Sequence, residues 1–450
     1  MMQRSTGRRP LVFCLAFLAL VARAARAEDD LLALYFAAQE HDPVYQQAKL
    51  ERDIAIQGMR EARAGNGPSL TMGIEASQIY QDIRESDNFL FQTGKSDFVD
   101  QRFELSLTQP IYRAETLRRL PQGHAQMRRA EAALAAAEQE LMVRLAEAVF
   151  NAMAARDILE FATAERAAIG RQVEESEQRL TSGLAKITDV HDGRARYEDS
   201  VAREIEAQDA MAEARLIIAE ITGREPSQLG SLRDGFPLVG PDPPEREAWV
   251  RTALFQNHRL ESLREIAEVA RYEVDVQKAA RVPTVSFVAS YTGSESGGSV
   301  FLGGGGSQIL NTNVGIRLGI PIYDSGLWSS RAQAASLRHQ ATLQDIEREK
   351  GRLERETQVA FQGVVSGITR VRALQQAVFS QERALESTEE SFRAGLGTGR
   401  AVLDSRRDLF SVQRDHSLAR YVYVLSTLRL QQATGALGLQ QLQRVSANIQ

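Results

Sequence analysis

The sequence predicts a mainly α-helical chain with a membrane β part, built from long helical hairpins and four β-strands. Three observations support this fold class. The chain consists of two similar halves, each half holds two segments of alternating polarity, and each half holds about sixty residues with almost no helix breaker. Alternation with period two is typical of strands, whereas long breaker-free stretches are typical of helices.

Corresponding landmarks of the two halves are separated by 215, 211, 212 and 212 residues. They are the pairs Pro68 and Pro283, Pro110 and Pro321, Gly183 and Gly395, and Gly223 and Gly435. A near-constant offset indicates an internal repeat, which sets the architecture before any local assignment. We therefore expect a first structural repeat over 28–223, a Pro-rich connector over 224–247, a second repeat over 248–435 and a C-terminal tail over 436–450.

The first 27 residues are typical of a secretory signal peptide. Arginines precede an apolar run over 11–21, and an Ala-Arg-Ala cleavage site follows at 25–27. The apolar run is shorter than the ~20 residues that a membrane anchor needs. The only cysteine, Cys14, lies inside the apolar run rather than at the cleavage point, which argues against a lipid anchor. We expect an exported chain that is periplasmic, secreted or inserted in a membrane as a β-barrel, because no later stretch is apolar enough for a transmembrane helix.

The four strands are expected at about 68–80, 99–111, 283–292 and 312–322. In the first, Leu70, Met72 and Ile74 alternate with Thr71 and Gly73, and the other three segments alternate similarly. A half-buried soluble sheet would also alternate. Each segment has roughly the length that crosses a bilayer when tilted, and aromatic residues lie near both ends, which favours a membrane barrel.

Four strands cannot close a barrel, because an open edge in lipid leaves backbone groups unpaired. Spanning barrels have about eight strands or more. We therefore expect the chain to combine its strands with those of further copies of itself.

Long helices are expected from about 122 to 180 and from about 327 to 392. Each turns back near Gly183 or Gly395 into an antiparallel helix, over about 187–222 and about 400–434. Apolar residues spaced by seven indicate a coiled-coil seam in the second hairpin. They are Val364, Val371, Val378, Leu385 and Phe392. A plain coiled-coil dimer would share this seam, but it would not explain why each long helix joins a membrane-type strand through a proline.

Four stretches carry a resemblance to a known family: 107–112 (Leu-Thr-Gln-Pro-Ile-Tyr), 183–190, 319–324 and 431–435. With their order and spacing, the chain resembles the TolC family of outer-membrane efflux and type I secretion channels. The resemblance implies a homotrimer with a shared 12-stranded outer-membrane β-barrel and a twelve-helix tunnel that projects into the periplasm. It also implies a periplasmic adaptor (membrane fusion protein) and an inner-membrane ABC or proton-driven transporter as partners, besides the exported substrate and the outer-membrane lipid.

The resemblance also implies an inner entrance lined by polar and acidic residues near the helix tips. The positions that match are Thr188, Asp189 and Asp404. Three further family positions differ, being Ala401, Gly397 and Phe392 in this chain. We therefore expect a gate that is weaker or built differently.

An apolar leucine follows the turn glycine at each otherwise polar tip. The residues are Gly183 with Leu184, and Gly395 with Leu396. We expect these tips to contact the adaptor, whereas the plainer interpretation is that the leucines only stabilise the turns.

Other function classes find little support. The formal net charge of -5 argues against a nucleic-acid partner. Gly94-Lys95-Ser96 lacks the rest of a phosphate-binding loop, and the six histidines show no metal-ligand spacing. We expect no enzyme activity, no cofactor and no metal.

The remaining alternative from another class is a soluble periplasmic coiled-coil adaptor. Within the channel class, type I protein secretion competes with drug or metal efflux. The absence of a lipid-anchor cysteine and the Gln109-Pro110-Ile111-Tyr112 stretch favour type I secretion.

Overall fold

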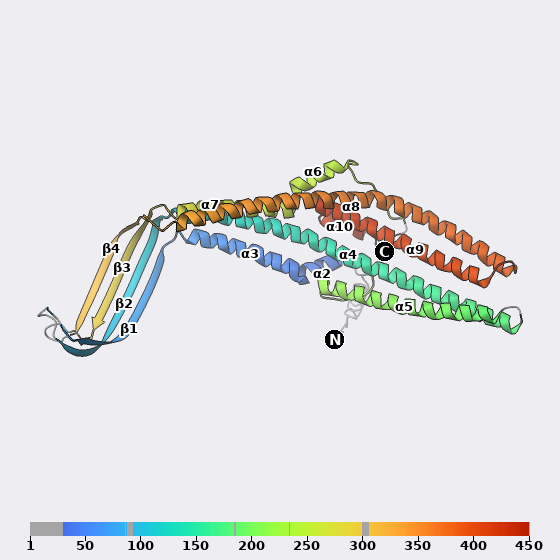
Figure 1. Ribbon diagram of the computed structural model, residues 1–450, viewed down its shortest axis with the longest axis horizontal. Helices are drawn as coiled ribbons and strands as arrows, with labels where there is room; N and C mark the ends of the chain where they lie inside the picture. The colour runs from blue at the N-terminus through green and yellow to red at the C-terminus, as the bar shows by residue number, and fades with distance from the viewer. Residues whose placement is uncertain are drawn as a thin grey trace, which may run out of the picture. The chain divides into compact units, whose positions relative to one another are not determined.

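A computed structural model of the protein describes residues 30–85, 87, 93–183, 186–233, 235–298 and 306–449. The described elements follow one another in chain order (Figure 1). They are α2 (Leu31–His41), α3 (Pro43–Ala64), β1 (Ser69–Ile83), β2 (Gly94–Tyr112), α4 (Ala114–Thr181), α5 (Ile187–Thr222), α6 (Arg246–Gln256), α7 (His258–Ala279), β3 (Thr284–Ser296), β4 (Ser307–Gly319), α8 (Leu327–Arg393), α9 (Gly399–Ala433) and α10 (Leu439–Ser446). The predicted fold class, mainly helical with four strands, is confirmed.

The chain divides into two compact units. Unit 1 comprises 1–50, 132–260 and 348–450, and unit 2 comprises 51–131 and 261–347. Both units therefore draw residues from both sequence repeats, as expected if the repeats lie side by side rather than forming separate domains. Each unit is described by itself below.

Unit 2 contains one antiparallel sheet with strand order β1-β2-β3-β4. The register places the apolar positions of neighbouring strands on one face: Met72 lies opposite Leu105, and Leu105 lies opposite Tyr291. Three residues further along β1, Glu75 lies opposite Arg102 on the other face. A one-residue slip would exchange the two faces, so the alternation fixes this register.

The strands differ from their expected bounds at both ends of the sheet. β1 and β2 extend further toward the loop that joins them, to Ile83 and from Gly94. β4 ends at Gly319, before Pro321, whereas β2 continues through Pro110 to Tyr112 with an irregular register. Proline has no N–H to donate, so pairing either stops beside it or continues around an irregularity.

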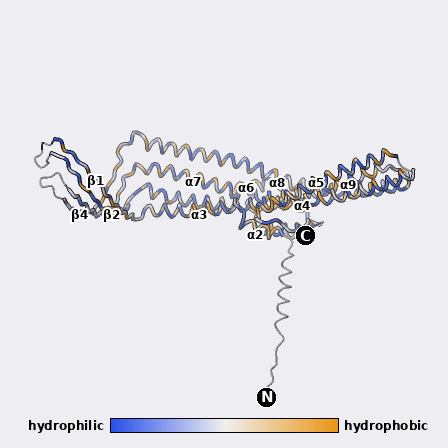
Figure 2. The backbone as a smooth tube through the Cα atoms, turned by 90° about the horizontal axis from the view of Figure 1, so that it is seen from below, coloured by the Kyte–Doolittle hydropathy of each residue, from blue (hydrophilic) through white to orange (hydrophobic). Residues whose placement is uncertain are grey.

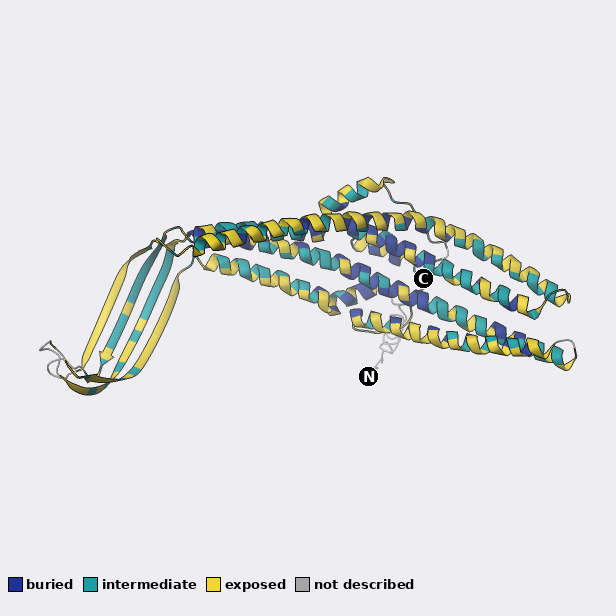
Figure 3. Cartoon of the chain, viewed as in Figure 1, coloured by how far each residue is buried: buried dark blue, intermediate teal, exposed yellow. Residues whose placement is uncertain are grey.

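The edge strands are the most exposed part of this sheet in a single chain (Figure 3). Within the described chain, β1 pairs only with β2, and β4 pairs only with β3. Apolar side chains on these edge strands are open to solvent, with Ile74 73% and Ile316 72% exposed. The sheet is therefore incomplete, both along its edges and over its apolar face.

The long helices are amphipathic rather than uniformly apolar. α4 has 68 residues and α8 has 67, and hydrophilic and hydrophobic residues alternate along them (Figure 2). Over the described residues, no helix combines the length and the hydrophobicity that crossing a membrane requires. Some of their hydrophobic residues are buried against other helices, whereas others, such as Val359 and Phe379 on α8, are exposed in a single chain.

The main hydrophobic core lies in unit 1, where the middle of α4 meets α2 and α9. Leu141, Leu145 and Phe150 on α4 are almost completely buried, and Phe150 packs against the ring of Tyr421 at 5.7 Å between centroids. In α8, the seam residues Val364 and Val371 are buried as predicted. Beyond Val371 no described residue of α8 is fully buried (Figure 3), although Val190 on α5 and Val402 on α9 are buried near the tips.

Two equivalent joints reflect the internal repeat. Asp42 separates α2 from α3 and accepts a hydrogen bond from the N–H of Tyr45, and Asn257 separates α6 from α7 and accepts one from Leu260. Each side chain caps the start of the helix that follows it. The two joints contact different long helices. Arg144 on α4 pairs with Asp42 at 2.8 Å, whereas Asn257 donates a hydrogen bond to the carbonyl of Ala433 on α9.

Arginines of α4 and α9 hold the connector against these helices. Arg156 on α4 donates to the carbonyls of Leu229 and Gly230, at 2.6 and 2.8 Å, and Arg420 on α9 donates to the carbonyls of Leu232 and Arg233. These bonds satisfy carbonyl groups that lack a helix or sheet partner.

The C-terminal tail is more ordered than we expected. It contains α10, whose Leu442 is fully buried, and Ile449 forms a bridge to Leu232 of the connector. The tail thus closes over the same core as the connector.

Candidate functional site at the helix tips

Each helical hairpin of unit 1 turns at a glycine with left-handed backbone geometry. The φ angles are +74° at Gly183 and +77° at Gly395. A residue with a Cβ is strained in this region, which explains glycine at both turns. Leu396 follows the second turn and is 87% exposed. Leu184, its expected counterpart, lies outside the described residues.

Side-chain caps begin the two returning helices. The carboxylate of Asp189 accepts a hydrogen bond from the N–H of Lys186 at 3.3 Å, and the hydroxyl of Thr398 accepts one from Ala401 at 3.3 Å. Asp189 also lies in the first turn of α5, where its negative charge interacts favourably with the helix dipole. Thr188 beside it is exposed. Within one chain, Asp189 thus has a local structural role.

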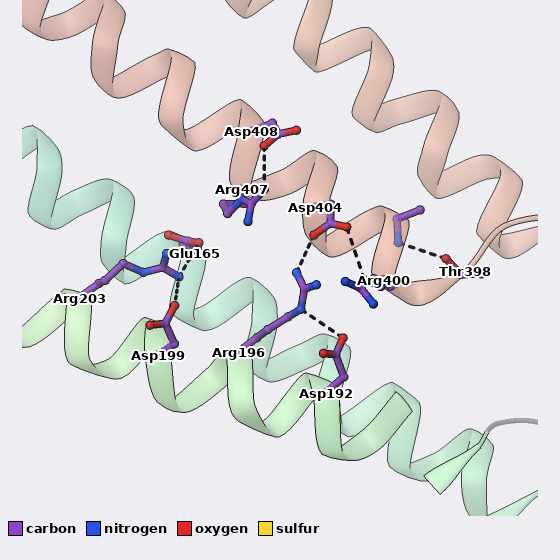
Figure 4. Close-up of polar contacts among 11 residues, drawn as sticks. Glu165, Asp192, Arg196, Asp199, Arg203, Thr398, Arg400, Asp404, Arg407 and Asp408 are labelled. Carbon is purple, nitrogen blue, oxygen red and sulfur yellow. Dashed lines mark hydrogen bonds and ion pairs between the residues drawn. The ribbon is translucent and has the colours of Figure 1, made fainter. Parts of the chain in front are cut away.

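Asp404 lies between two arginines near the start of α9 (Figure 4). Arg196 on α5 donates to its carboxylate at 2.7 Å, and Arg400, one turn earlier on α9, lies 3.9 Å from its other oxygen. Arg196 also contacts Asp192 at 3.3 Å. The hydrogen bond from Arg196 is the main reason that the pKa of Asp404 lies below its usual value.

Two further arginines connect the hairpins near their tips. Arg406 on α9 donates to the carbonyl of Ala168 on α4, and it pairs with Glu389 on α8 at 2.7 Å. The guanidinium of Arg179 on α4 lies 4.5 Å from the ring centroid of Phe392 on α8, a cation–π distance. Contacts based on arginine therefore link the two hairpins near their tips, where no described residue of α8 is fully buried.

The first hairpin has its own ion pairs between α4 and α5. Arg203 on α5 lies 3.1 Å from Glu165 on α4, and it also lies 3.2 Å from Asp199, one turn earlier on α5 (Figure 4). The pKa of Glu165 is raised because its burial disfavours the charged form. Further along, Glu204 pairs with Arg166 at 2.8 Å while it is itself buried.

The structure brings together only part of the predicted site. Asp404 contacts Arg196, but no contact in the described chain joins it to Thr188 or Asp189. The sequence analysis did not identify Arg196. The pair spans 208 residues, and no local pattern marks it; the only local hint is Asp192, one turn before Arg196.

Comparisons with known proteins identify the class. The family described as "Outer membrane efflux protein" matches residues 34–224 and 249–436. The chain is 31% identical to outer membrane protein TolC of Vibrio cholerae, over 97% of this chain and 98% of that protein. It is 27% identical to the alkaline protease secretion protein AprF of Pseudomonas aeruginosa, over 98% and 92%. The fold is also that of the CmeC outer membrane channel of Campylobacter jejuni, with a TM-score of 0.76, 16% identity, and coverage of 94% and 91%.

These findings define an outer-membrane channel protein, not an enzyme. The chain belongs to the outer membrane efflux protein family, the TolC family, over both of its repeats. The outer-membrane location is thereby established, and the alternative of a soluble periplasmic adaptor is set aside.

Proposed function

We propose that three copies of this chain form the exit duct of a tripartite export system. The observation that carries this proposal is the incomplete sheet of unit 2. Its unpaired edges, β1 and β4, are antiparallel to each other in the order that would let β4 of one copy pair with β1 of the next. Three copies would supply twelve strands, leaving no open edge in the membrane.

The dimensions of the apolar face support this assembly. From Leu70 to Tyr80 the outward positions of β1 span ten residues, about 33 Å along the strand. Tilted by about 40°, that length covers the ~25 Å apolar band of outer-membrane barrels. The opposite face carries Glu75, Arg102 and Glu104, which would then line a water-filled interior.

Type I protein secretion is the export system that we favour. Its support is the similarity to AprF, a protein named for alkaline protease secretion, over nearly the full length of both chains. A drug or metal efflux pump is the second candidate, because the family's own description is efflux. An adaptor and an inner-membrane transporter, of the ABC type for secretion, would complete the system.

Within this duct we assign the tips to adaptor contact and the start of α9 to the entrance. Gly395 and the exposed Leu396, with Gly183 and Leu184 on the other hairpin, would meet the adaptor. Asp404, with Thr188 and Asp189, would line the entrance, where three copies place three of each around one axis.

Two measurements test this function. The mass of the purified protein in detergent should be that of a trimer, and a folded, inserted monomer would contradict the assembly. Deletion of the gene should then remove specific proteins from the culture medium without raising susceptibility to drugs or metals. Raised susceptibility with an unchanged set of secreted proteins would instead support the efflux pump.

A further inference from the structure

In unit 2, all four places where a strand joins a helix lie at the same end of the sheet (Figure 1). The antiparallel register shows this, because Ser69 at the start of β1 lies opposite Thr108 near the end of β2. Thr284 at the start of β3 likewise lies opposite Gly319, where β4 ends. Each place consists of a short link and the adjacent two turns of helix. These four junction segments are 58–68, 113–120, 273–283 and 320–333.

The junction segments are basic, whereas the opposite end of the sheet is acidic. The junction segments hold eight basic and five acidic residues, although the whole chain has a formal net charge of -5. The described residues at the opposite end, within 82–100 and 293–311, include two basic and six acidic ones. All eight basic residues of the junction segments are exposed, and we call them the junction collar. They are Arg60, Arg63, Arg113, Arg118, Arg119, Lys278, Arg281 and Arg331.

The charges of the junction collar are not neutralised within the chain. Among the described residues, Arg119 is the only collar member with an ion-pair partner, Glu115 at 2.7 Å. The other acids of the junction segments mostly have contacts of their own. Glu273 accepts hydrogen bonds from two glutamines at 2.8 and 2.6 Å, and Asp324 accepts one from a backbone N–H at 3.0 Å. The exposed charge at this end of the sheet is therefore almost entirely positive.

The helix dipole explains only part of the junction collar. Arg63 and Lys278 lie in the last turns of α3 and α7, where a cation interacts favourably with the dipole. Arg113 directly precedes α4, and Arg118 and Arg331 lie in the second turns of α4 and α8. The start of a helix carries partial positive charge, so these three arginines gain nothing from the dipole. Their positive charge at this end of the sheet therefore needs a partner outside the chain.

The order of residues along the chain indicates what that partner is. Beyond the end of β4, Ile320 and Ile322 continue the alternation of its apolar face and are 58% and 89% exposed. Tyr323 follows and is 84% exposed, and Arg331 comes next along α8. The run 111–113, Ile-Tyr-Arg, repeats this order from β2 into α4. Apolar, then aromatic, then cationic is the order met on leaving the hydrocarbon of a bilayer through its headgroups.

We propose that the junction collar binds the anionic headgroups of phospholipids in the periplasmic leaflet of the outer membrane. This inference rests on the proposed function, which places the sheet in the membrane, and it names the lipid chemistry at the inner rim. Lys and Arg next to a membrane surface attract anionic lipids, and salt screens this attraction. The acidic opposite end of the sheet would repel such lipids, so the preference is confined to one leaflet.

Lipid retention by the purified protein tests this inference. The protein is reconstituted with equal amounts of phosphatidylglycerol, which is anionic, and phosphatidylcholine, which has no net charge. It is then extracted in a non-ionic detergent, and the lipids that remain bound are quantified by mass spectrometry. At low salt the wild type should retain phosphatidylglycerol in roughly tenfold excess. At about 1 M salt, where the Debye length is about 3 Å, most of this excess should disappear.

Three sets of substitutions locate the site. The collar variant, which should retain both lipids equally, combines Arg113→Gln, Arg118→Gln, Arg281→Gln and Arg331→Gln. Lysine at the same four positions should preserve the preference, because the attraction needs the charge rather than the guanidinium geometry. The matched control removes the same charge from four exposed arginines of unit 1 and should also preserve it. This control combines Arg171→Gln, Arg251→Gln, Arg372→Gln and Arg444→Gln.

The outcomes separate this inference from the proposed function. Equal retention of the two lipids by the wild type would overturn lipid binding, and so would a preference that the collar variant keeps. If the collar instead pairs with acids of the next copy, the collar variant should lose its trimer while the wild type shows no lipid preference, which would also overturn the inference. A wild type that forms no trimer in detergent would overturn the proposed duct, whichever lipid it retains.

Discussion

Arg196 on α5 donates a 2.7 Å hydrogen bond to Asp404 on α9, joining the two hairpins across 208 residues of sequence. Asp404 is the position that the sequence analysis assigned to an acidic ring at the tunnel entrance. Its side chain is 40% exposed and that of Arg196 is 23% exposed, so the pair is accessible to solvent on one side. The positive charge of Arg196 therefore opposes any preference for permeating cations that Asp404 would give the channel.

This relationship predicts how ion selectivity responds to three variants. Asp404→Asn should reduce the cation preference of the channel, because in the proposed trimer it would remove three carboxylates around the entrance. Arg196→Gln should increase that preference, because it exposes the same carboxylates. The double variant should match Asp404→Asn, since Arg196 acts on selectivity through Asp404. Reversal potentials in a salt gradient give the ion selectivity of the wild type and of the three variants. Unchanged selectivity in Asp404→Asn would mean that Asp404 has only a structural role.

The same pair predicts a limited dependence on pH. The hydrogen bond from Arg196 lowers the pKa of Asp404 in the folded protein below its unfolded value of about 4. A lowered pKa means that the stabilisation is present above the unfolded pKa and is lost only as pH falls through the lower, folded value. The contribution of Asp404 to selectivity should therefore stay constant from pH 7 to about pH 5, and it should be lost only at pH values lower than the unfolded pKa of about 4. The difference in ion selectivity between the wild type and Asp404→Asn measures the contribution of Asp404. A change in this difference between pH 7 and pH 5 would contradict the lowered pKa of Asp404.

The sequence predicted the strands and helices because their signals are local. Alternation with period two placed Met72, Leu105 and Tyr291 on one face, and the structure pairs them across β1, β2 and β3. Breaker-free stretches and turn glycines placed both hairpins. The strand ends were less accurate, because pairing beside Pro110 and Pro321 depends on the neighbouring strand rather than on the proline alone.

The site was less predictable because its contacts are long-range. The Arg196–Asp404 pair joins helices from different repeats, and a pattern within either helix does not specify its partner in the other. The sequence analysis did not predict α10 for a different reason. Leu442 and Val445 show helical spacing, but a segment of eight residues is too short for its periodicity to distinguish a helix from an irregular tail.

Exposed Leu396 predicts a variant with a defect in export alone. Leu396→Asp, combined with Leu184→Asp, should abolish export while leaving the trimer inserted, because it adds charge to the proposed apolar contact with the adaptor, and Leu396 is exposed rather than part of the core. The matched control is Val239→Asp in the connector, where an apolar side chain is 64% exposed away from the tips. Secreted protein and membrane-inserted trimer are measured in the same cells. Normal export by the double variant would show that the two leucines only stabilise their turns and do not contact the adaptor.

The turn glycines predict a graded series of stability losses. Gly395 and Gly435 have nearly the same φ, +77° and +71°, so a Cβ causes similar backbone strain at both. Their surroundings differ: a Cβ at Gly395 would meet no atom within 4 Å, whereas one at Gly435 would clash with the carbonyl oxygen of Gln256.

Gly395→Ala should therefore cost about 1–2 kcal/mol, the strain of a left-handed residue with a Cβ. Gly435→Ala should cost roughly 3 kcal/mol or more, because relieving the clash requires the end of α6 to move away from the end of α9. Gly223→Ala should fall between them, since its Cβ would meet the ring of His41 at 2.7 Å and a side chain moves more easily than backbone. Apparent unfolding midpoints of the detergent-solubilised proteins, scanned at one rate, measure the order. Equal shifts for Gly395→Ala and Gly435→Ala would show that the joint between α6 and α7 is not held tightly against the end of α9.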